Sequence, residues 1–137
     1  MFDFVVKYFG FLKHVPGLPH FFDSFLKIHT SLSDSSVLDY CDEIENEVLL
    51  WDRMSVSTHK FGGVQFNLGS KEIGHIHGNG LLDILFNREI KNRLLVTGRV
   101  SDHHVFRDSG WVSVWIRKSE DKLLAIELLR QSYDLRK

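Results

Sequence analysis

The chain has 137 residues, 43% of them hydrophobic, and its 17 Lys and Arg residues nearly balance 18 Asp and Glu residues. This length and apolar content predict a single domain, residues 1–137, with a buried core. A formal net charge of -1 creates no field that would attract a polyanion, so nucleic acid is not an expected partner. The single cysteine excludes an internal disulfide, and no secretory or membrane-spanning pattern is present, so a cytoplasmic location is predicted.

The first thirty residues are rich in phenylalanine and show helical spacing. The apolar positions predict helices over residues 2–13 and 19–29 with a Pro-Gly pair between them, which makes residues 1–32 a helical hairpin extension. We expect this hairpin to cover one side of the core. The apolar face of its second helix carries Phe21, Phe22, Phe25 and Ile28. Contact of residues 2–29 with a membrane surface or a partner protein is the alternative.

A third helix is predicted to begin near Ser36, where Asp39 completes a pattern similar to a capping box. One face of this helix is apolar and carries Val37, Cys41, Ile44, Val48 and Trp51. We expect the Cys41 thiol to fill the core, because the local sequence supplies no base or cation that would activate it.

The pattern changes from helical to alternating at Met54 and predicts an antiparallel meander with turns at Gly69-Ser70 and Asn79-Gly80. Asn87 can cap a helix that runs to about residue 96, a strand follows over residues 110–116, and Ser119 can cap a final helix. The predicted fold is therefore α+β. N-terminal helices precede an antiparallel sheet of about five strands, with one inserted helix and a C-terminal helix packed on one face.

Two histidines on one predicted strand, His75 and His77, mark the candidate site, because alternate residues of a strand point to the same face. The turn that follows decides what opposes them. A two-residue turn at Asn79-Gly80 would place both histidines among apolar residues. If Gly78 joins the loop, His75 instead opposes Asp83, a carboxylate placed to orient an imidazole.

The segment HHVFRDSGW, residues 103–111, is the second candidate, because loops on a rigid sheet often carry function. It contributes His103, His104 and Trp111 to the predicted site. Ser109 belongs to a turn and lacks the G-x-S-x-G context of a nucleophilic serine, so a Ser-His-Asp triad is disfavoured.

Three roles for the histidines stay open: they can satisfy polar groups of the core, form a metal or small-molecule pocket, or act in acid–base catalysis. The predicted ligand-binding set is His75, His77, Asp83, His103, His104 and Trp111. Within it, His75 and His77 are the predicted metal ligands, and a transition metal such as zinc is the candidate cofactor, with a third ligand from His59, His103 or His104. The functional hypotheses are a binding domain with a His-lined pocket, a metal-assisted hydrolase at the same residues, or a protein or nucleic-acid interaction module.

The runs HKFGGVQFNLGSKEIGHIHGNGLLDILF, NREIKNRLL and HHVFRDSGWVSVWI, with a last helix that ends LLRQSYD, resemble the small family labelled luciferase domain. The resemblance covers about residues 37–135 and implies one α+β domain there. Lys71 stands where Arg is expected in that family, and Asn87 where Pro is usual. The label does not imply light emission here, because the sequence has no flavin, nucleotide or P-loop fingerprint. More distantly, the closing strand and helix are similar to double-wing proteins with a frataxin-like fold, which bears on fold rather than function.

Overall fold

The computed structural model describes residues 15–137. In this part of the chain four helices and six strands follow in the order α2 (Leu18–Ser33), α3 (Ser36–Leu49), β1 (Met54–Thr58), β2 (Val64–Leu68), β3 (Lys71–Ile76), β4 (Leu81–Leu85), α4 (Arg88–Val96), β5 (Ser101–Asp102), β6 (Trp111–Trp115) and α5 (Ser119–Asp134). The helix predicted over residues 2–13 lies outside the described residues.

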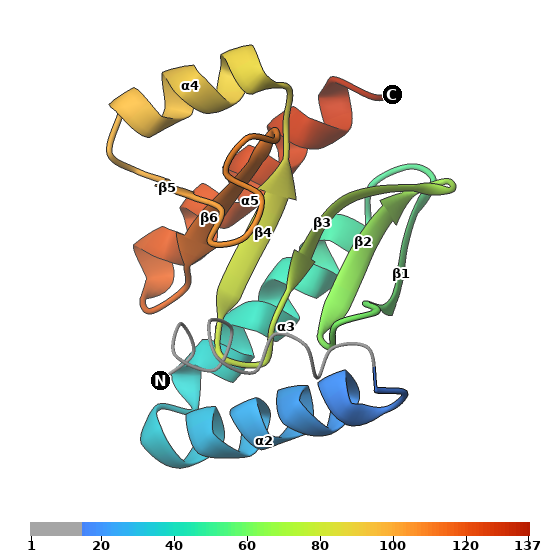
Figure 1. Ribbon diagram of the computed structural model, residues 1–137, viewed down its shortest axis with the longest axis vertical. Helices are drawn as coiled ribbons and strands as arrows, with labels where there is room; N and C mark the ends of the chain where they lie inside the picture. The colour runs from blue at the N-terminus through green and yellow to red at the C-terminus, as the bar shows by residue number, and fades with distance from the viewer. Residues whose placement is uncertain (1–14) are drawn as a thin grey trace.

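The strands form one antiparallel sheet in the order β1-β2-β3-β4-β6-β5 (Figure 1). The predicted α+β fold is confirmed, with N-terminal helices, an inserted helix and a C-terminal helix. The sheet has six strands rather than about five. The additional strand, β5, has only two residues, which is too short to leave an alternating pattern in the sequence.

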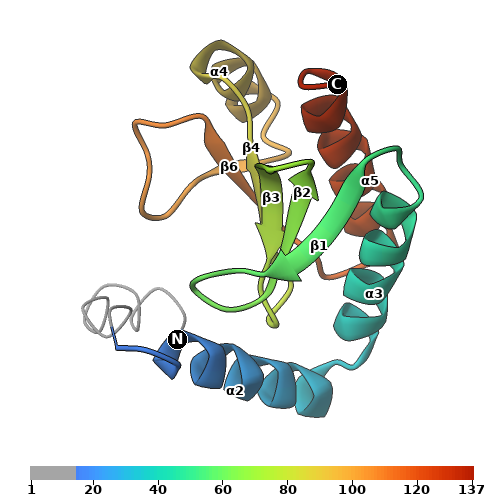
Figure 2. The same cartoon turned by 90° about the vertical axis from the view of Figure 1, so that its right-hand side faces the viewer.

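One face of the sheet packs on α3 and α5, which lie together on the same side (Figure 2). A row of register partners on this face runs from Phe66 through Gly74 and Ile84 to Val112, and all four are buried. A Cβ at Gly74 would lie 2.8 Å from the carbonyl oxygen of Asp83 and 3.1 Å from a methyl carbon of Leu129. The glycine thus allows α5 to approach the middle of the sheet closely, which seals the apolar face.

The opposite face carries a polar row that crosses all six strands. Its members are register partners in turn: Ser57, Gln65, His75, Asp83, Ser113 and Ser101. The three central members, from β3, β4 and β6, are buried. The loop between β5 and β6 projects on this side, away from α3 and α5 (Figure 2). The candidate site lies where this loop and the polar row meet.

The expectation that the apolar face of α2 covers the core is wrong for most of its residues. Phe21 is 72% exposed, Phe25 is 50% exposed and Ile28 is 61% exposed. The helix instead packs through its other side, where Asp23 and Leu26 are buried, because that side meets the loops at one end of the sheet. No helix within residues 15–137 has both the length and the apolar character to cross a bilayer.

The predicted helix caps are only partly correct. Asn87 caps α4, because its Oδ1 accepts from Ile90 N at 2.8 Å. At α3, the Asp34 carboxylate accepts from Ser36 N at 3.1 Å, in place of the predicted capping box. At α5, Ser119 is the first helical residue and the cap is Lys118, whose N–H donates to the Asp121 carboxylate at 3.1 Å. At each of these helix starts a side-chain oxygen of Asn or Asp accepts from a backbone N–H that the helix itself leaves without a partner.

Candidate functional site

The hairpin between β3 and β4 closes through a three-residue loop, residues 78–80. His77 N donates to Leu81 O at 2.9 Å, and Gly80 N donates to His77 O at 2.9 Å. The register therefore places His75 opposite Asp83. Of the two turns that the sequence allows, the structure has the one that brings a carboxylate to the histidines.

Asp23 of α2 holds this loop from outside the hairpin. Its Oδ1 accepts a hydrogen bond from Gly78 N at 2.8 Å, and the Asp23 side chain is buried. A Cβ at Gly78 would lie 2.3 Å from Cγ of Lys27, so only glycine permits α2 to come this close. The carboxylate thereby satisfies a buried N–H that the three-residue loop leaves outside the sheet ladder.

Asp83 is the centre of the histidine cluster and its side chain is 0% exposed. Ser113 Oγ donates to its Oδ1. Its Oδ2 lies 3.4 Å from Nε2 of His75, 3.7 Å from Nε2 of His77 and 3.6 Å from Nε2 of His103. Yet Oδ2 makes no hydrogen bond. A buried carboxylate oxygen without a hydrogen bond is costly, so this atom is the clearest sign of a ligand-binding position.

The electrostatics of Asp83 and His75 follow from this packing. Burial opposes ionisation of Asp83, but the neighbouring His75 and His77 outweigh it and hold the pKa of Asp83 far below its usual range. Burial also opposes protonation of His75, but the carboxylates of Asp83 and Glu72 outweigh it and raise the pKa of His75. Among protein groups, His75 is therefore the cation that balances Asp83.

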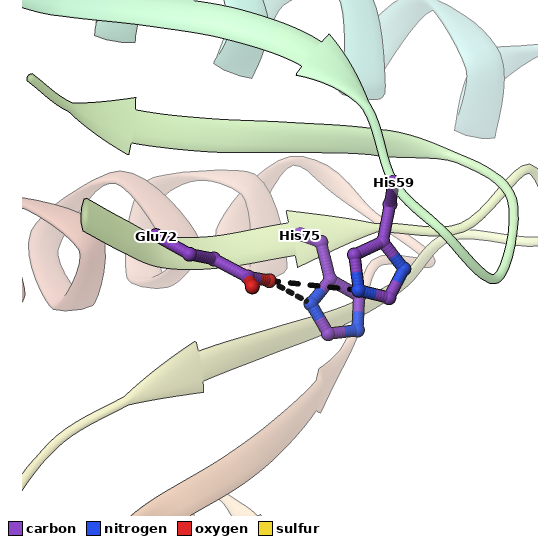
Figure 3. A group of neighbouring side chains, drawn as sticks. All are labelled: His59, Glu72 and His75. Carbon is purple, nitrogen blue, oxygen red and sulfur yellow. Dashed lines mark hydrogen bonds and ion pairs between the residues drawn. The ribbon is translucent and has the colours of Figure 1, made fainter. Parts of the chain in front are cut away.

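A β-bulge brings Glu72 to the same cluster. The register between β2 and β3 shifts so that Ile73 has no partner, and Glu72 and His75 reach the same face although they are three residues apart. Oε1 of Glu72 lies 2.7 Å from Nδ1 of His75 and 3.7 Å from Nε2 of His59 (Figure 3). The rings of His59 and His75 stack with centroids 3.8 Å apart. Burial lowers the pKa of His59 to about 3, so His59 is the neutral member of this stack.

His103 reaches Asp83 from the loop between β5 and β6. Its Nδ1 accepts hydrogen bonds from Val105 N and from Phe106 N, both at 3.0 Å. Burial lowers the pKa of His103 to about 4, which outweighs the opposing effect of Asp83. His103 is therefore neutral, and because Nδ1 is an acceptor, its hydrogen is assigned to Nε2.

Lys91 of α4 fixes the shape of this loop. Its Nζ donates to Arg107 O at 2.5 Å and to Ser109 O at 3.0 Å, and it pairs with Asp102 at 2.7 Å. The Lys91 side chain is almost completely buried, so these contacts replace its hydration. The loop that carries His103 is thus held to α4 at two carbonyl groups.

All six residues of the predicted ligand-binding set come together around Asp83. His75, His77 and His103 surround its carboxylate, as described above. The ring of Trp111 lies 5.2 Å from that of His75 and 6.1 Å from that of His103, measured between centroids. His104 stacks on His103 with centroids 4.5 Å apart. Residues from β3, β4, β6 and the loop before β6 therefore form one cluster.

Three groups within the described residues have ligand atoms close enough to share a metal ion: His75, His77 and Asp83; His59, Glu72 and His75; and Asp83, His103 and His104. Hydrogen bonding distinguishes them. Nδ1 of His59 accepts from Phe61 N at 3.4 Å, and Nδ1 of His103 accepts two N–H groups, so Nε2 of each carries a hydrogen. Nδ1 of His75 donates to the Glu72 carboxylate, so Nε2, which is directed at Asp83, is the nitrogen that would exchange its proton for a metal ion. The first group contains neither His59 nor His103, so it is the strongest candidate of the three.

Two other reactive side chains have structural roles. Ser109 Oγ donates to Phe106 O at 2.5 Å and accepts from Trp111 N at 3.2 Å, which is turn bonding rather than the contact of a nucleophile with a base. Cys41 packs against the core, and burial raises its pKa to about 12. Neither residue belongs to the candidate site.

The sequence prediction omitted three residues that shape the site. The β-bulge places Glu72 on the same face as His75. A glycine inside a strand, here Gly74, often marks a bulge and was the sequence feature that could have indicated it. Ser113 lies on the same predicted face as Trp111. Because β6 pairs with β4, Ser113 is the register partner of Asp83 and donates to its carboxylate. Asp23 lies 55 residues before Gly78, and no local pattern links the two.

Residues 70–132 match the sequence model of the family described as Luciferase domain. The matched segment begins just before β3, ends within α5, and contains His75, His77, Asp83 and His103. The match supports the family label that the sequence motifs suggested. No curated protein and no solved structure matches the chain significantly.

Proposed function

We propose that this luciferase-domain chain binds a transition-metal ion, zinc being the type that fits best, through His75, His77 and Asp83. The ion would present a further coordination position to a small molecule. The observation that carries the proposal is the buried Oδ2 of Asp83, which makes no hydrogen bond although imidazole nitrogens surround it. A shared cation satisfies such an oxygen and the nitrogens together.

The spacing of the donor atoms supports a zinc-sized ion. With metal–ligand bonds of about 2.0–2.2 Å, two ligands of a tetrahedral zinc ion lie roughly 3.3 Å apart. The distances from Asp83 Oδ2 to the two nitrogens are 3.4 Å for His75 and 3.7 Å for His77. Small side-chain shifts would bring both nitrogens to bonding distance of one ion.

The surroundings of the ligands also match those of known metal sites in their chemistry. Histidine ligands usually donate their second N–H to a carboxylate or a carbonyl, which fixes the ring and raises its basicity. Glu72 is in this position against His75 Nδ1, at 2.7 Å. Ser113 holds the other oxygen of Asp83. Glu72 therefore orients His75, and Ser113 orients Asp83, before a metal ion binds.

Two histidines and one carboxylate make three protein ligands, and zinc sites with three protein ligands keep a position for water or substrate. A zinc ion bound in this way lowers the pKa of its water and polarises carbonyl groups. The binding domain and the metal-assisted hydrolase are therefore two uses of one site, and metal binding is the claim that both share.

Metal analysis of the full chain, purified without an affinity tag, tests this proposal. We expect close to one equivalent of zinc or another transition metal per chain, and a large loss in His77→Ala and Asp83→Asn. His29→Ala is the matched control, because His29 is exposed on α2 and outside the cluster. Circular dichroism would verify that each variant folds. Wild-type protein that is metal-free and takes up no added zinc would refute the proposal, as would equal metal content in all four proteins.

A further inference from the structure

His103 approaches Oδ2 of Asp83, as His75 and His77 do. Its Nδ1 accepts hydrogen bonds, whereas Nδ1 of His75 donates one to Glu72. Nδ1 of His103 already accepts two backbone N–H groups, from Val105 and Phe106. A nitrogen that accepts in this way carries no hydrogen, so Nε2 of the ring must carry it. An N–H group cannot serve as a metal ligand, because its lone pair belongs to the ring.

The Nε2–H group of His103 has no good acceptor among the described residues. Its nearest acidic oxygen is Asp83 Oδ2 at 3.6 Å, which is too long for a hydrogen bond. The side chain is only 4% exposed, so bulk water is a poor substitute. A buried donor directed at the centre of a cluster of ligand atoms is placed for a bound molecule.

The position of this donor is fixed by its surroundings. Phe106 lies against the ring with centroids 5.1 Å apart, and His104 stacks on it at 4.5 Å. Lys91 holds the same loop through the carbonyl groups of Arg107 and Ser109. The N–H group is therefore oriented before a ligand binds, which lowers the cost of binding.

We infer that His103 is a hydrogen-bond donor to the bound ligand and not a metal ligand, and that the ligand is a small carboxylate whose oxygen occupies the open coordination position. The inference rests on the proposed metal site. Within its coordination sphere, a dication with one carboxylate ligand keeps a net positive charge, which favours an anion at the open position. A fixed N–H donor beside it favours an oxygen that accepts a hydrogen bond.

Two substitutions separate the functions of the two ring nitrogens. His103→Asn places an acceptor near the position of Nδ1, which preserves the bonds to Val105 and Phe106, but it has no group at the position of Nε2. His103→Gln can extend an amide N–H toward the position of Nε2 and lacks the acceptor at Nδ1. Both variants should bind one metal ion per chain.

The measurement is a titration of the cobalt-substituted full chain with acetate, followed by visible absorption, with neutral imidazole as a comparison ligand. Loss of one hydrogen bond to a charged group should weaken acetate binding by roughly ten- to a hundredfold in His103→Asn. His103→Gln should retain more of the affinity, and imidazole binding should be unchanged in both variants.

Each outcome decides the inference separately from the metal proposal. Loss of the metal from His103→Asn would identify His103 as a metal ligand and overturn the inference. Acetate affinity equal to that of the wild type would also overturn it, as would equal losses for acetate and imidazole. Failure of the wild-type chain to bind cobalt or zinc would refute the metal proposal itself.

Discussion

His75 and Asp83 are register partners on adjacent antiparallel strands, with Nε2 of the histidine 3.4 Å from Oδ2 of the aspartate. This relationship depends on one residue of loop length, because a two-residue turn would have put Ile84 opposite His75. A register shift of one residue turns every side chain of a strand to the other face. The loop over residues 78–80 is therefore the structural condition for the site.

Removal of the charge that orients His75 should weaken metal binding without unfolding the chain. Glu72→Gln keeps the shape of the side chain but replaces the carboxylate that faces His75 Nδ1 with a weaker acceptor. Changes of this kind cost roughly ten- to a hundredfold in metal affinity. Zinc titration calorimetry would measure the loss. Glu127→Gln is the control, since Glu127 pairs with Arg99 on the surface. Equal zinc affinities in the two variants would show that Glu72 does not support metal binding.

Loss of the contact between Asp23 and the loop should destabilise the fold. Asp23→Ala leaves the buried Gly78 N–H without its acceptor, which should lower the free energy of unfolding by about 1–3 kcal/mol. Asp23→Asn retains an acceptor oxygen and should lose less than half as much. Urea unfolding of both variants tests this pair, and an alanine variant as stable as the wild type would show that the contact is not needed.

The buried lysine under the His103 loop should matter far more than an exposed basic residue on the same helix. Lys91→Met keeps the apolar stem but removes the bonds to Arg107 O and Ser109 O, and should cost about 1–3 kcal/mol. Arg93 pairs with Glu89 where the two side chains are 69% and 81% exposed, so Arg93→Met should stay within about 0.5 kcal/mol of the wild type. Thermal or urea unfolding would measure both, and comparable losses of stability would contradict the role given to the Lys91 hydrogen bonds.

The thiol of Cys41 should be inert in the folded chain. Because burial raises its pKa from 9.0 to about 12, only about one thiol in ten thousand is ionised near pH 8, against roughly a tenth in the unfolded chain. A disulfide reagent should therefore react slowly with native protein and fast in denaturant. The stability linked to this group is complete below about pH 9 and falls as the pH rises toward 12. Equal reaction rates in the two states would show that the thiol is accessible.

Local sequence patterns were sufficient to predict most of the strands and helices. The alternation from Met54 onward and the glycine-containing turns predicted β1 to β4, because side-chain period and turn conformation are local properties. Asn87 predicted the start of α4 for the same reason. The exposed face of α2 could not be predicted, since its spacing of Phe21, Phe25 and Ile28 is that of a helix packed on a core. Which face of α2 is buried depends on its contacts with the loops at Gly62 and Gly78.

The sequence indicated which candidate residues would lie together, but not their geometry. The spacing of His75 and His77 placed both on one face, and Asp83 was one of two possible partners. The choice between them was not local, because both turns suit an Asn-Gly pair, and the N–H of Gly78 in the observed loop is satisfied by Asp23, 55 residues earlier. Glu72 was missed because a regular strand would direct it away from His75, and only the bulge reverses this.

The most direct test of the metal site is an anomalous diffraction map from crystals of the full chain grown or soaked with zinc and measured at the zinc absorption edge. We expect one strong peak within about 2.0–2.2 Å of Nε2 of His75, Nε2 of His77 and Oδ2 of Asp83. Nε2 of His103 should lie outside bonding distance of that peak. A fully soaked crystal without a peak at Asp83, or with the ion bound between His59 and Glu72 instead, would contradict it.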